Sequence, residues 1–303
     1  MAGKMNRRNF IGSSLLGAAA GLSLEHQILM GRMAEGGAAE QKEPVTGLPK
    51  GRIGSLEVSR LICGGNLFSG FAHSRDLIYV SELMTHYFTD NKIIETLTLA
   101  EQNGINTAIL RCDEHIVRVL TRYRKERGGK IQWIAQTYPR EEDLTSNIQL
   151  AVDNGAVGAF PQGGIGDTFY KDGKFDLLAK AIAFIKQNGL AAGVGSHDLN
   201  VTRTAEQQQL GCDFYFKTFN NEDYNSEPVE QIAAYFKSVK KPWIAFKVLG
   251  AGLLQPKVGF LRAFSLGADF INVGMFDWQV RDDAQVAKDI LTRKLERERA
   301  WFS

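Results

Sequence analysis

The sequence has few cysteines, almost no net charge and no long hydrophobic run. Its three cysteines, Cys63, Cys112 and Cys212, are odd in number and widely spaced, which argues against a disulfide framework or a zinc knuckle. We interpret them as small apolar core residues. The 36 Lys and Arg residues nearly balance the 34 Asp and Glu residues, giving a formal net charge of +2. No basic patch is interleaved with aromatic residues, so nucleic-acid binding has no support.

The apolar run nearest the N-terminus, Phe10–Leu24, is too short and too rich in glycine, alanine and serine for a membrane span of about 20 apolar residues. It follows Arg7 and Arg8, and the segment resembles a twin-arginine export signal. We therefore expect residues 1–39 to be a signal segment and 40–52 a linker. Export by the twin-arginine translocase would place the protein in the periplasm. A disordered basic tail or an uncleaved anchor is the alternative interpretation.

The rest of the chain repeats one pattern, in which an amphipathic stretch is closed by a stop, usually glycine, and followed by a short apolar run. Glycine can adopt the left-handed conformation that ends a helix, and each apolar run is typical of a buried strand. Eight such runs follow Ser59, Asn103, Gly128, Asn154, Asn188, Gly211, Lys240 and Gly267. Strands and helices that alternate eight times predict a single (β/α)8 TIM barrel over residues 53–303.

In such barrels the chemistry sits at the carboxyl ends of the strands. The side chains that we expect there are Asn66, Arg111, Asp113, Gln136, Gln162, His197, Asp198, Lys217, Asn220, Lys247 and Asn272. The connection after the first strand is unusually long and contains His73, so we expect it to cover the pocket as a lid.

Lys217 and Lys247 end adjacent predicted strands, where each ammonium group could lower the pKa of the other. A free amine in this position can form an imine with a carbonyl substrate. We therefore name Lys217, Lys247, His197 and Asp113 as catalytic candidates. The alternative is that each lysine pairs with a carboxylate at the barrel mouth.

The strand ends also offer an unusual set of neutral amides, and an amide suits a hydroxyl-rich ligand because it both donates and accepts hydrogen bonds. The candidates for substrate binding are Asn66, His73, Arg111, Gln136, Gln162, Asn220 and Asn272. This composition favours a sugar or a small polyol. A metal site built from His197, Asp198, Asp113 and His115 is a lesser alternative, because glutamates are almost absent from the strand ends.

Several motifs together resemble the aldo/keto reductase superfamily over roughly residues 53–291. "IAFKVLGAGLL" at Ile244 resembles the family's seventh strand and cofactor turn, and "AAGVGSHDL" at Ala191 resembles its fifth strand. "GSLEVSRLICGGN" at Gly54 resembles its opening hairpin and first strand. The resemblance implies NAD(P) as a possible cofactor, with Phe246, Leu249, Gly250 and Gly252 as its binding residues.

The catalytic tetrad of that family has no counterpart here. Ile109 stands at the aspartate position, and no tyrosine follows at the family's spacing. Gln136 stands at the lysine position and Gln162 in the histidine region. We therefore expect no NADPH-dependent reduction of generic aldehydes.

The sequence as a whole predicts an exported enzyme that acts on a small polar, sugar-derived carbonyl or hydroxyl compound. One alternative is a lyase, aldolase or isomerase that works through Lys217 or Lys247. The other is a non-catalytic barrel that binds a ligand or a partner.

Overall fold

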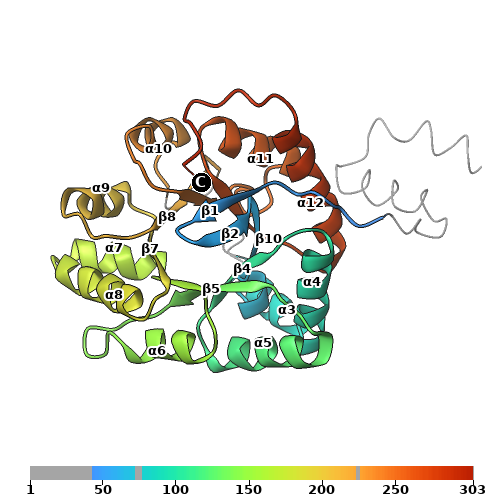
Figure 1. Cartoon of the computed structure of the whole chain (residues 1–303), viewed down its shortest axis with the longest axis horizontal. Coiled ribbons are helices and arrows are strands. Elements are labelled where there is room, and N and C mark those ends of the chain that lie inside the picture. The colour runs from blue at the N-terminus through green and yellow to red at the C-terminus, as the bar shows by residue number, and fades with distance from the viewer. Residues whose placement is uncertain (1–42, 72–76, 223–225, 303) are drawn as a thin grey trace, which may run out of the picture. The chain divides into compact units, whose positions relative to one another are not determined.

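The computed structural model describes residues 43–71, 77–222 and 226–302, and residues Pro44–Ser303 make up one folded unit. The expected signal segment and His73 lie outside the described residues. The unit is built around a closed barrel of parallel strands, and helices surround the barrel (Figure 1).

Eight strands close the barrel in the order β10-β3-β4-β5-β6-β7-β8-β9, and every neighbouring pair is parallel. The predicted (β/α)8 barrel is therefore confirmed, and each predicted apolar run contains one strand. The strands are β3 (Leu61–Gly64), β4 (Thr107–Arg111), β5 (Gln132–Thr137), β6 (Gly158–Pro161), β7 (Ala191–Ser196), β8 (Phe214–Thr218), β9 (Trp243–Phe246) and β10 (Phe270–Gly274).

The helices lie between successive strands and pack their apolar faces on the outside of the barrel. They are α3 (Tyr79–Tyr87), α4 (Asp90–Gln102), α5 (Glu114–Arg127), α6 (Ser146–Asp153), α7 (Gly163–Lys171), α8 (Phe175–Gln187), α9 (Leu199–Gln207), α10 (Val229–Phe236), α11 (Pro256–Ser265) and α12 (Asp277–Thr292), with the short 3-10 helix η2 (Leu67–Ser69) after β3. Within the described residues, no helix has the length and apolarity needed to cross a membrane.

An antiparallel hairpin of β1 (Lys50–Ile53) and β2 (Leu56–Ser59) precedes the barrel. Its Ile53 and Val58 pack against lumen residues, so the hairpin closes one end of the barrel (Figure 1). The expected linker, residues 40–52, overlaps this hairpin. Val45 and Leu48 are also buried in the core, so the ordered fold begins earlier than the sequence indicated. The physical reason is that isolated apolar side chains in a polar stretch give no periodic signal.

Side chains along each strand alternate between the lumen and the outer core, as the two-residue period of a strand requires. The lumen is filled by a separate apolar cluster that includes Ile62, Ile109, Ile134, Phe160, Phe214, Phe216, Ile244, Phe246 and Phe270. The lumen is therefore a packed core, and polar groups are found at its carboxyl-end mouth.

The chain ends beside the buried carboxylate of Asp269, which precedes β10. Arg299 donates to Asp269 Oδ2 at 2.6 Å, and the backbone N–H of Phe302 donates to Asp269 Oδ1 at 2.9 Å. Because breaking a buried ion pair is costly, this contact fixes the C-terminal segment at the amino end of the strands.

Candidate functional site

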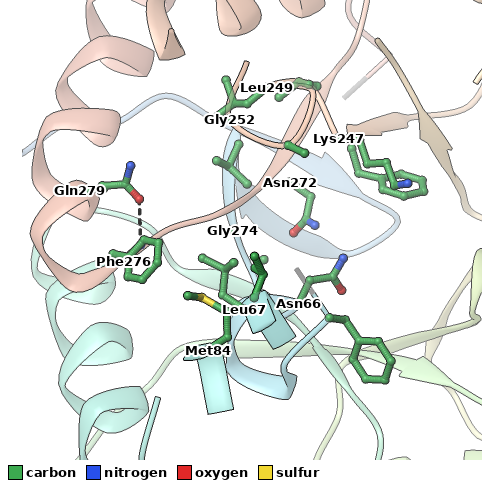
Figure 2. Close-up of a pocket in the computed structure, with 17 residues that line it drawn as sticks. Asn66, Leu67, Met84, Lys247, Leu249, Gly252, Asn272, Gly274, Phe276 and Gln279 are labelled. Atoms are coloured by element: carbon green, nitrogen blue, oxygen red, sulfur yellow. Dashed lines mark hydrogen bonds between the residues drawn. The ribbon is translucent and has the colours of Figure 1, made fainter. Parts of the chain in front are cut away.

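A cavity of about 370 Å³ lies at the carboxyl ends of β3, β9 and β10. The long connection after β3 forms part of its wall through Leu67, Phe71, Val80 and Met84, which fits the expected covering role of that segment. The cavity is mainly apolar, and Figure 2 shows Asn66, Asn272 and Lys247 among the polar residues that line it. Small-molecule sites commonly measure about 300–1,000 Å³, so the volume suits a small ligand.

Asn272 is the polar residue best placed to recognise a ligand. It lies two residues after Phe270 on β10, so its amide faces the lumen side of the strand. A Cβ on Gly64 would lie 3.0 Å from its Nδ2, so the glycine provides the room that the amide occupies. Its Oδ1 is buried and accepts no hydrogen bond from any described residue. A ligand hydroxyl or amine could donate to this oxygen.

Phe246 forms one wall of the cavity and also connects it to the neighbouring polar network. Its ring stacks on Phe216 at 4.1 Å between centroids and meets the His197 ring edge-on at 5.6 Å. His197 therefore lies at the barrel mouth beside a residue that lines the cavity.

The turn after β9 has a left-handed backbone at Lys247, Gly250, Ala251 and Gly252. Four of its N–H groups donate within the turn: Gly250 to the Lys247 carbonyl at 2.9 Å, Gly252 to the Leu249 carbonyl at 3.1 Å, and those of Leu253 and Leu254 to the carbonyls of Gly250 and Leu249. These internal bonds reduce the number of donors that the turn could offer to a pyrophosphate.

The charge beside this turn is also unsuited to phosphate. A Cβ on Gly250 would lie 2.6 Å from the Cβ of Glu222, so this acidic residue packs directly against the turn. Arg262 is held by Glu222 in a bidentate pair of 2.8 and 2.7 Å, and the Arg262 guanidinium holds the pKa of Glu222 below its usual value.

A whole NADPH molecule therefore does not fit the residues present. Phe246 and Leu249 could contact a nicotinamide ring, and the cavity includes Gly252 but not Gly250. Among the described residues that line the cavity, however, Lys247 is the one cation, whereas a phosphorylated dinucleotide carries several negative charges. The residues fit a smaller ligand better.

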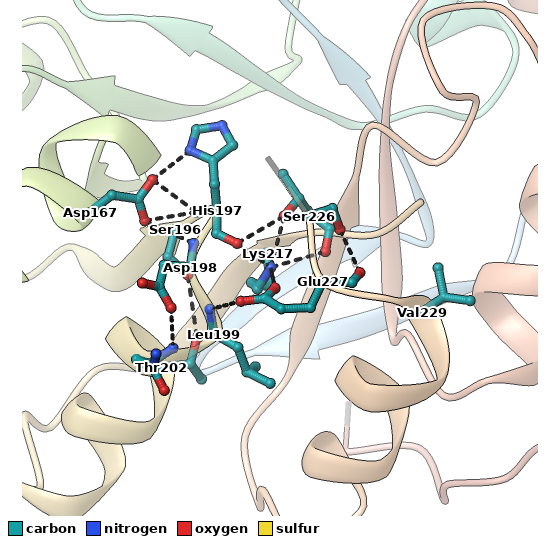
Figure 3. A network of polar contacts seen from close by, with 12 residues as sticks. Asp167, Ser196, His197, Asp198, Leu199, Thr202, Lys217, Ser226, Glu227 and Val229 are labelled. Carbon is teal, nitrogen blue, oxygen red and sulfur yellow. Dashed lines mark hydrogen bonds and ion pairs between the residues drawn. The ribbon is translucent and has the colours of Figure 1, made fainter. Parts of the chain in front are cut away.

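His197, whose ring contacts Phe246, forms a pair with Asp167, and Figure 3 shows this pair. The His197 Nδ1 donates to Asp167 Oδ2 at 2.7 Å, and the backbone N–H groups of His197 and Asp198 donate to Oδ1 at 2.9 and 3.0 Å. A Cβ on Gly163 would lie 3.1 Å from the His197 ring, so this glycine admits the imidazole. The carboxylate thus fixes the ring and leaves Nε2 as the other proton-transfer atom.

Asp167 was missed by sequence reasoning because it lies on α7 rather than at a strand end. A second, more open cavity of about 620 Å³ adjoins the pair and is lined by Gly164, Asp167, His197, Asp198, Ser226 and Glu227. The sequence signal that could have identified Asp167 is its position as an aspartate in the second turn of a helix that starts with glycines.

Lys217 does not share the cavity of Lys247, so the expected pair of amines is wrong. Phe214 and Phe216 face the lumen, and the two-residue period turns Lys217 to the outer face of β8. Its Nζ pairs with Glu227 Oε2 at 2.8 Å and donates to the His197 carbonyl at 2.5 Å.

Burial and the charge of the partner shift the pKa of each member of this ion pair in opposite directions. Desolvation lowers the pKa of Lys217, and the Glu227 carboxylate opposes that shift. Burial would raise the pKa of Glu227, but the Lys217 ammonium and the backbone N–H groups that donate to the carboxylate together hold the pKa below its usual value. The pair has a structural role, as the sequence alternative of a lysine–carboxylate contact allowed.

Most of the expected amides serve local structure instead of forming a ring. Gln162 caps α7 by accepting from the Ile165 N–H at 3.3 Å, and Asn220 accepts from the Glu222 N–H at 3.2 Å. Only Asn66 and Asn272 of the expected amides line the cavity. The support for a hydroxyl-rich ligand therefore rests on these two side chains.

Asp113 caps α5 by accepting from the Ile116 N–H at 2.9 Å, and its other oxygen lies 3.0 Å from Arg111 Nε. It therefore positions Arg111 and has no contact that suggests a catalytic role. Gln136 accepts a long hydrogen bond of 3.5 Å from the Tyr138 hydroxyl.

The residues of the alternative metal site are separated. His115 bonds Asp90 at 3.0 Å on the outer side of α5, whereas His197 bonds Asp167. Across the described ranges, no three His, Cys, Asp or Glu side chains are grouped so as to hold a metal ion.

No protein-family model matches the sequence, and no curated protein matches it. Among solved structures, the chain is similar to a "putative aldo-keto reductase" from Pseudomonas aeruginosa, with a TM-score of 0.59 and 16% identity over 84% of this chain and 100% of the other.

Two further similarities reach a TM-score of 0.51. The BexX/CysO complex from Amycolatopsis orientalis matches at 14% identity over 86% of this chain and 100% of that one. The N-acetylneuraminic acid synthetase from Leptospira borgpetersenii matches at 10% identity over 81% and 91%. At these identities the comparisons establish the barrel fold, which the chain shares with all three of these structures.

Proposed function

We propose that the protein is an enzyme that moves a proton at a small carbonyl or hydroxyl compound, with His197 as the general acid and base. The observation that supports this most directly is the 2.7 Å contact between His197 Nδ1 and Asp167 at the barrel mouth. A carboxylate that orients an imidazole and stabilises its charged form is a recurring device of acid–base catalysis.

His197 lines the second cavity and contacts Phe246 of the first, so the first cavity would supply the remaining groups to a substrate that extends past the Phe246 ring. Asn272 Oδ1 would accept from a substrate hydroxyl, and Asn66 offers a second amide on the same wall. In an isomerisation of a 2-hydroxy carbonyl compound, Nε2 of His197 would take the proton from the carbon beside the carbonyl and deliver it to the former carbonyl carbon, while the proton of the substrate hydroxyl moves to the carbonyl oxygen. Lys247 would then stabilise the negative charge that develops on the carbonyl oxygen.

This proposal retains the hydroxyl-bearing, sugar-derived type of substrate and sets aside the tetrad chemistry of the reductases. Of the two lysines expected to form an imine with a substrate, Lys247 is the one that lines the cavity, because Lys217 is buried in an ion pair on the outer face of its strand. We also propose that the enzyme works outside the cytoplasm, on the basis of the Arg7–Arg8 segment.

The experiment is proton exchange followed by NMR in heavy water, with a panel of small ketones and hydroxyketones. We expect the wild-type protein to catalyse deuterium incorporation at the carbon beside the carbonyl. His197→Gln should lower that rate roughly 100-fold or more, since a general base commonly contributes about 100- to 10,000-fold. Asp167→Asn should give an intermediate loss, because the imidazole loses its fixed orientation.

His86→Gln is the matched control, because this exposed histidine on α3 bonds only a backbone carbonyl of its own helix. It should leave exchange unchanged. If ketones bind to the wild-type protein but exchange no faster than in buffer, the barrel is a ligand-binding protein and the enzymatic proposal is wrong.

A further inference from the structure

Arg111 lies at the barrel mouth, next to the cavity but outside the His197–Asp167 pair. It lies two residues after Ile109 on β4, so it faces the lumen side of the strand. β3 pairs with β4 through Gly64 and Ile109, and Asn66 and Arg111 each follow this pair by two residues. Asn66 lines the cavity, so Arg111 is next to the site described above.

The guanidinium of Arg111 is held in place from three directions. The Phe71 ring lies 4.7 Å from its Cζ and the Tyr138 ring lies 4.4 Å from the same atom. Asp113 Oδ2 lies 3.0 Å from Nε. Phe71 is also part of the cavity wall, so one aromatic ring contacts both the cavity and the cation.

The far edge of the same guanidinium is available for a ligand. Among the described residues, the Arg111 guanidinium forms the ion pair with Asp113 through Nε and no geometrically regular hydrogen bond, and the side chain keeps 29% of its surface exposed. Stacking and the Asp113 contact have already ordered the side chain, so little conformational entropy would be lost on binding. Two parallel N–H groups on a fixed plane match the geometry of a carboxylate.

We propose that Arg111 is the specificity residue for a substrate that carries a carboxylate, such as a small 2-oxo or 2-hydroxy acid. This inference rests on the proposed function, because it names the class of compound that His197 would act on. The carboxylate would form two hydrogen bonds with Arg111. The remainder of the substrate would extend along Phe71 into the cavity.

A neutral polyol is the weaker choice for this position. It would not use the planar pair of donors, and the Phe71 and Tyr138 rings would offer it no hydrogen bonds. Lys247 also lines the cavity, and a second cation lowers the cost of bringing a negative charge into the site.

The test compares matched acid and ketone pairs in binding to the full chain, measured by calorimetry or ligand-observed NMR. One pair is 2-oxo-4-phenylbutanoate and 4-phenylbutan-2-one, in which a methyl group replaces the carboxylate. Pairs with shorter alkyl groups extend the panel. We expect at least one acid to bind the wild-type protein about 10-fold or more tightly than its ketone.

Arg111→Met should remove that preference while leaving the affinity for the ketone unchanged. Arg111→Lys should recover only part of it, because lysine keeps the charge but loses the planar pair of donors. Arg118→Gln is the control for overall charge, since Arg118 is exposed on α5 and bonds Asp90. It should bind like the wild type.

Equal binding of acids and ketones by the wild-type protein across the panel would overturn the inference. So would an acid preference that survives Arg111→Met. The proposed function fails separately: acid binding that depends on Arg111, without proton exchange that depends on His197, would retain this inference and reject the enzymatic proposal.

Discussion

Lys217 shows how a one-residue shift along a strand changes the role of a side chain. Its position at the end of β8 made it a catalytic candidate, but its neighbour Phe216 faces the lumen and Lys217 faces the outer core. There its ammonium group is fully buried and bonds Glu227, the His197 carbonyl and Thr218. The amine therefore supports the backbone of the histidine rather than reacting itself.

Lys217→Met should consequently destabilise the protein. We expect the free energy of unfolding to fall by about 2–4 kcal/mol, because breaking a buried ion pair commonly costs about 3–5 kcal/mol and Glu227 keeps 22% of its side chain exposed. Denaturant titration followed by circular dichroism measures the loss.

The double variant Lys217→Met with Glu227→Gln is the informative partner, since it removes the carboxylate left without a cation. It should recover part of the lost stability. A Lys217→Met protein with wild-type stability and no activity would instead restore the catalytic role that the sequence suggested.

At the scale of an element, α12 buries a carboxyl group on its inner face. The apolar face of this helix contains Val280, Ala284 and Ala287, and Asp283 lies among them. Burial, with a smaller contribution from the negative charge of Asp282, raises the pKa of Asp283 to about 7. Its folded-state pKa therefore lies above the unfolded value, and the native protein retains a proton on Asp283 that the unfolded chain releases between pH 4 and pH 7.

This difference predicts that stability falls as pH rises from about 4 through 7, because the unfolded state binds fewer protons in that interval. Asp283→Asn should remove this component and increase the free energy of unfolding above pH 7, by at most about 4 kcal/mol. Thermal or denaturant unfolding at pH 5 and pH 8 measures it. Asp289→Asn, on the exposed side of the same helix, is the control and should leave the pH profile unchanged.

At the scale of the whole molecule, the barrel assembles its site from distant parts of the chain. The cavity uses the connection after β3, the turn after β9 and the end of β10, and His197 approaches it through Phe246. The hairpin and the C-terminal segment close the opposite end, so the described fold separates a structural end from a site end. This division is general among (β/α)8 barrels.

The proposed location also concerns the whole molecule. Replacing both Arg7 and Arg8 by lysine should leave folded protein in the cytoplasm, because the twin-arginine pair is the feature that the segment shares with export signals. Cell fractionation followed by immunoblotting measures the distribution, and the wild-type chain serves as the reference. Delivery of the double variant to the periplasm at the wild-type level would reject export by this route.

The sequence by itself determined the barrel, because local patterns specify its strands and helices. The residues before each apolar run, usually a glycine, end a helix. The spacing of the apolar residues then indicates whether the next segment is a strand or a helix. The sequence also placed Asn66, Asn272 and Lys247 at strand ends, and in the structure all three line one cavity because their strands are neighbours in the closed barrel. The outward face of Lys217 was readable as well, from the alternation of Phe214 and Phe216 with their neighbours.

Only the tertiary structure decided which of these side chains work together. Asp167 reaches His197 from α7, and Phe71 and Tyr138 stack on Arg111 from two different connections. The positions of such partners depend on how helices and loops pack across the barrel mouth. No short-range pattern records that packing, so contacts between residues far apart in the chain appear only when the barrel has closed.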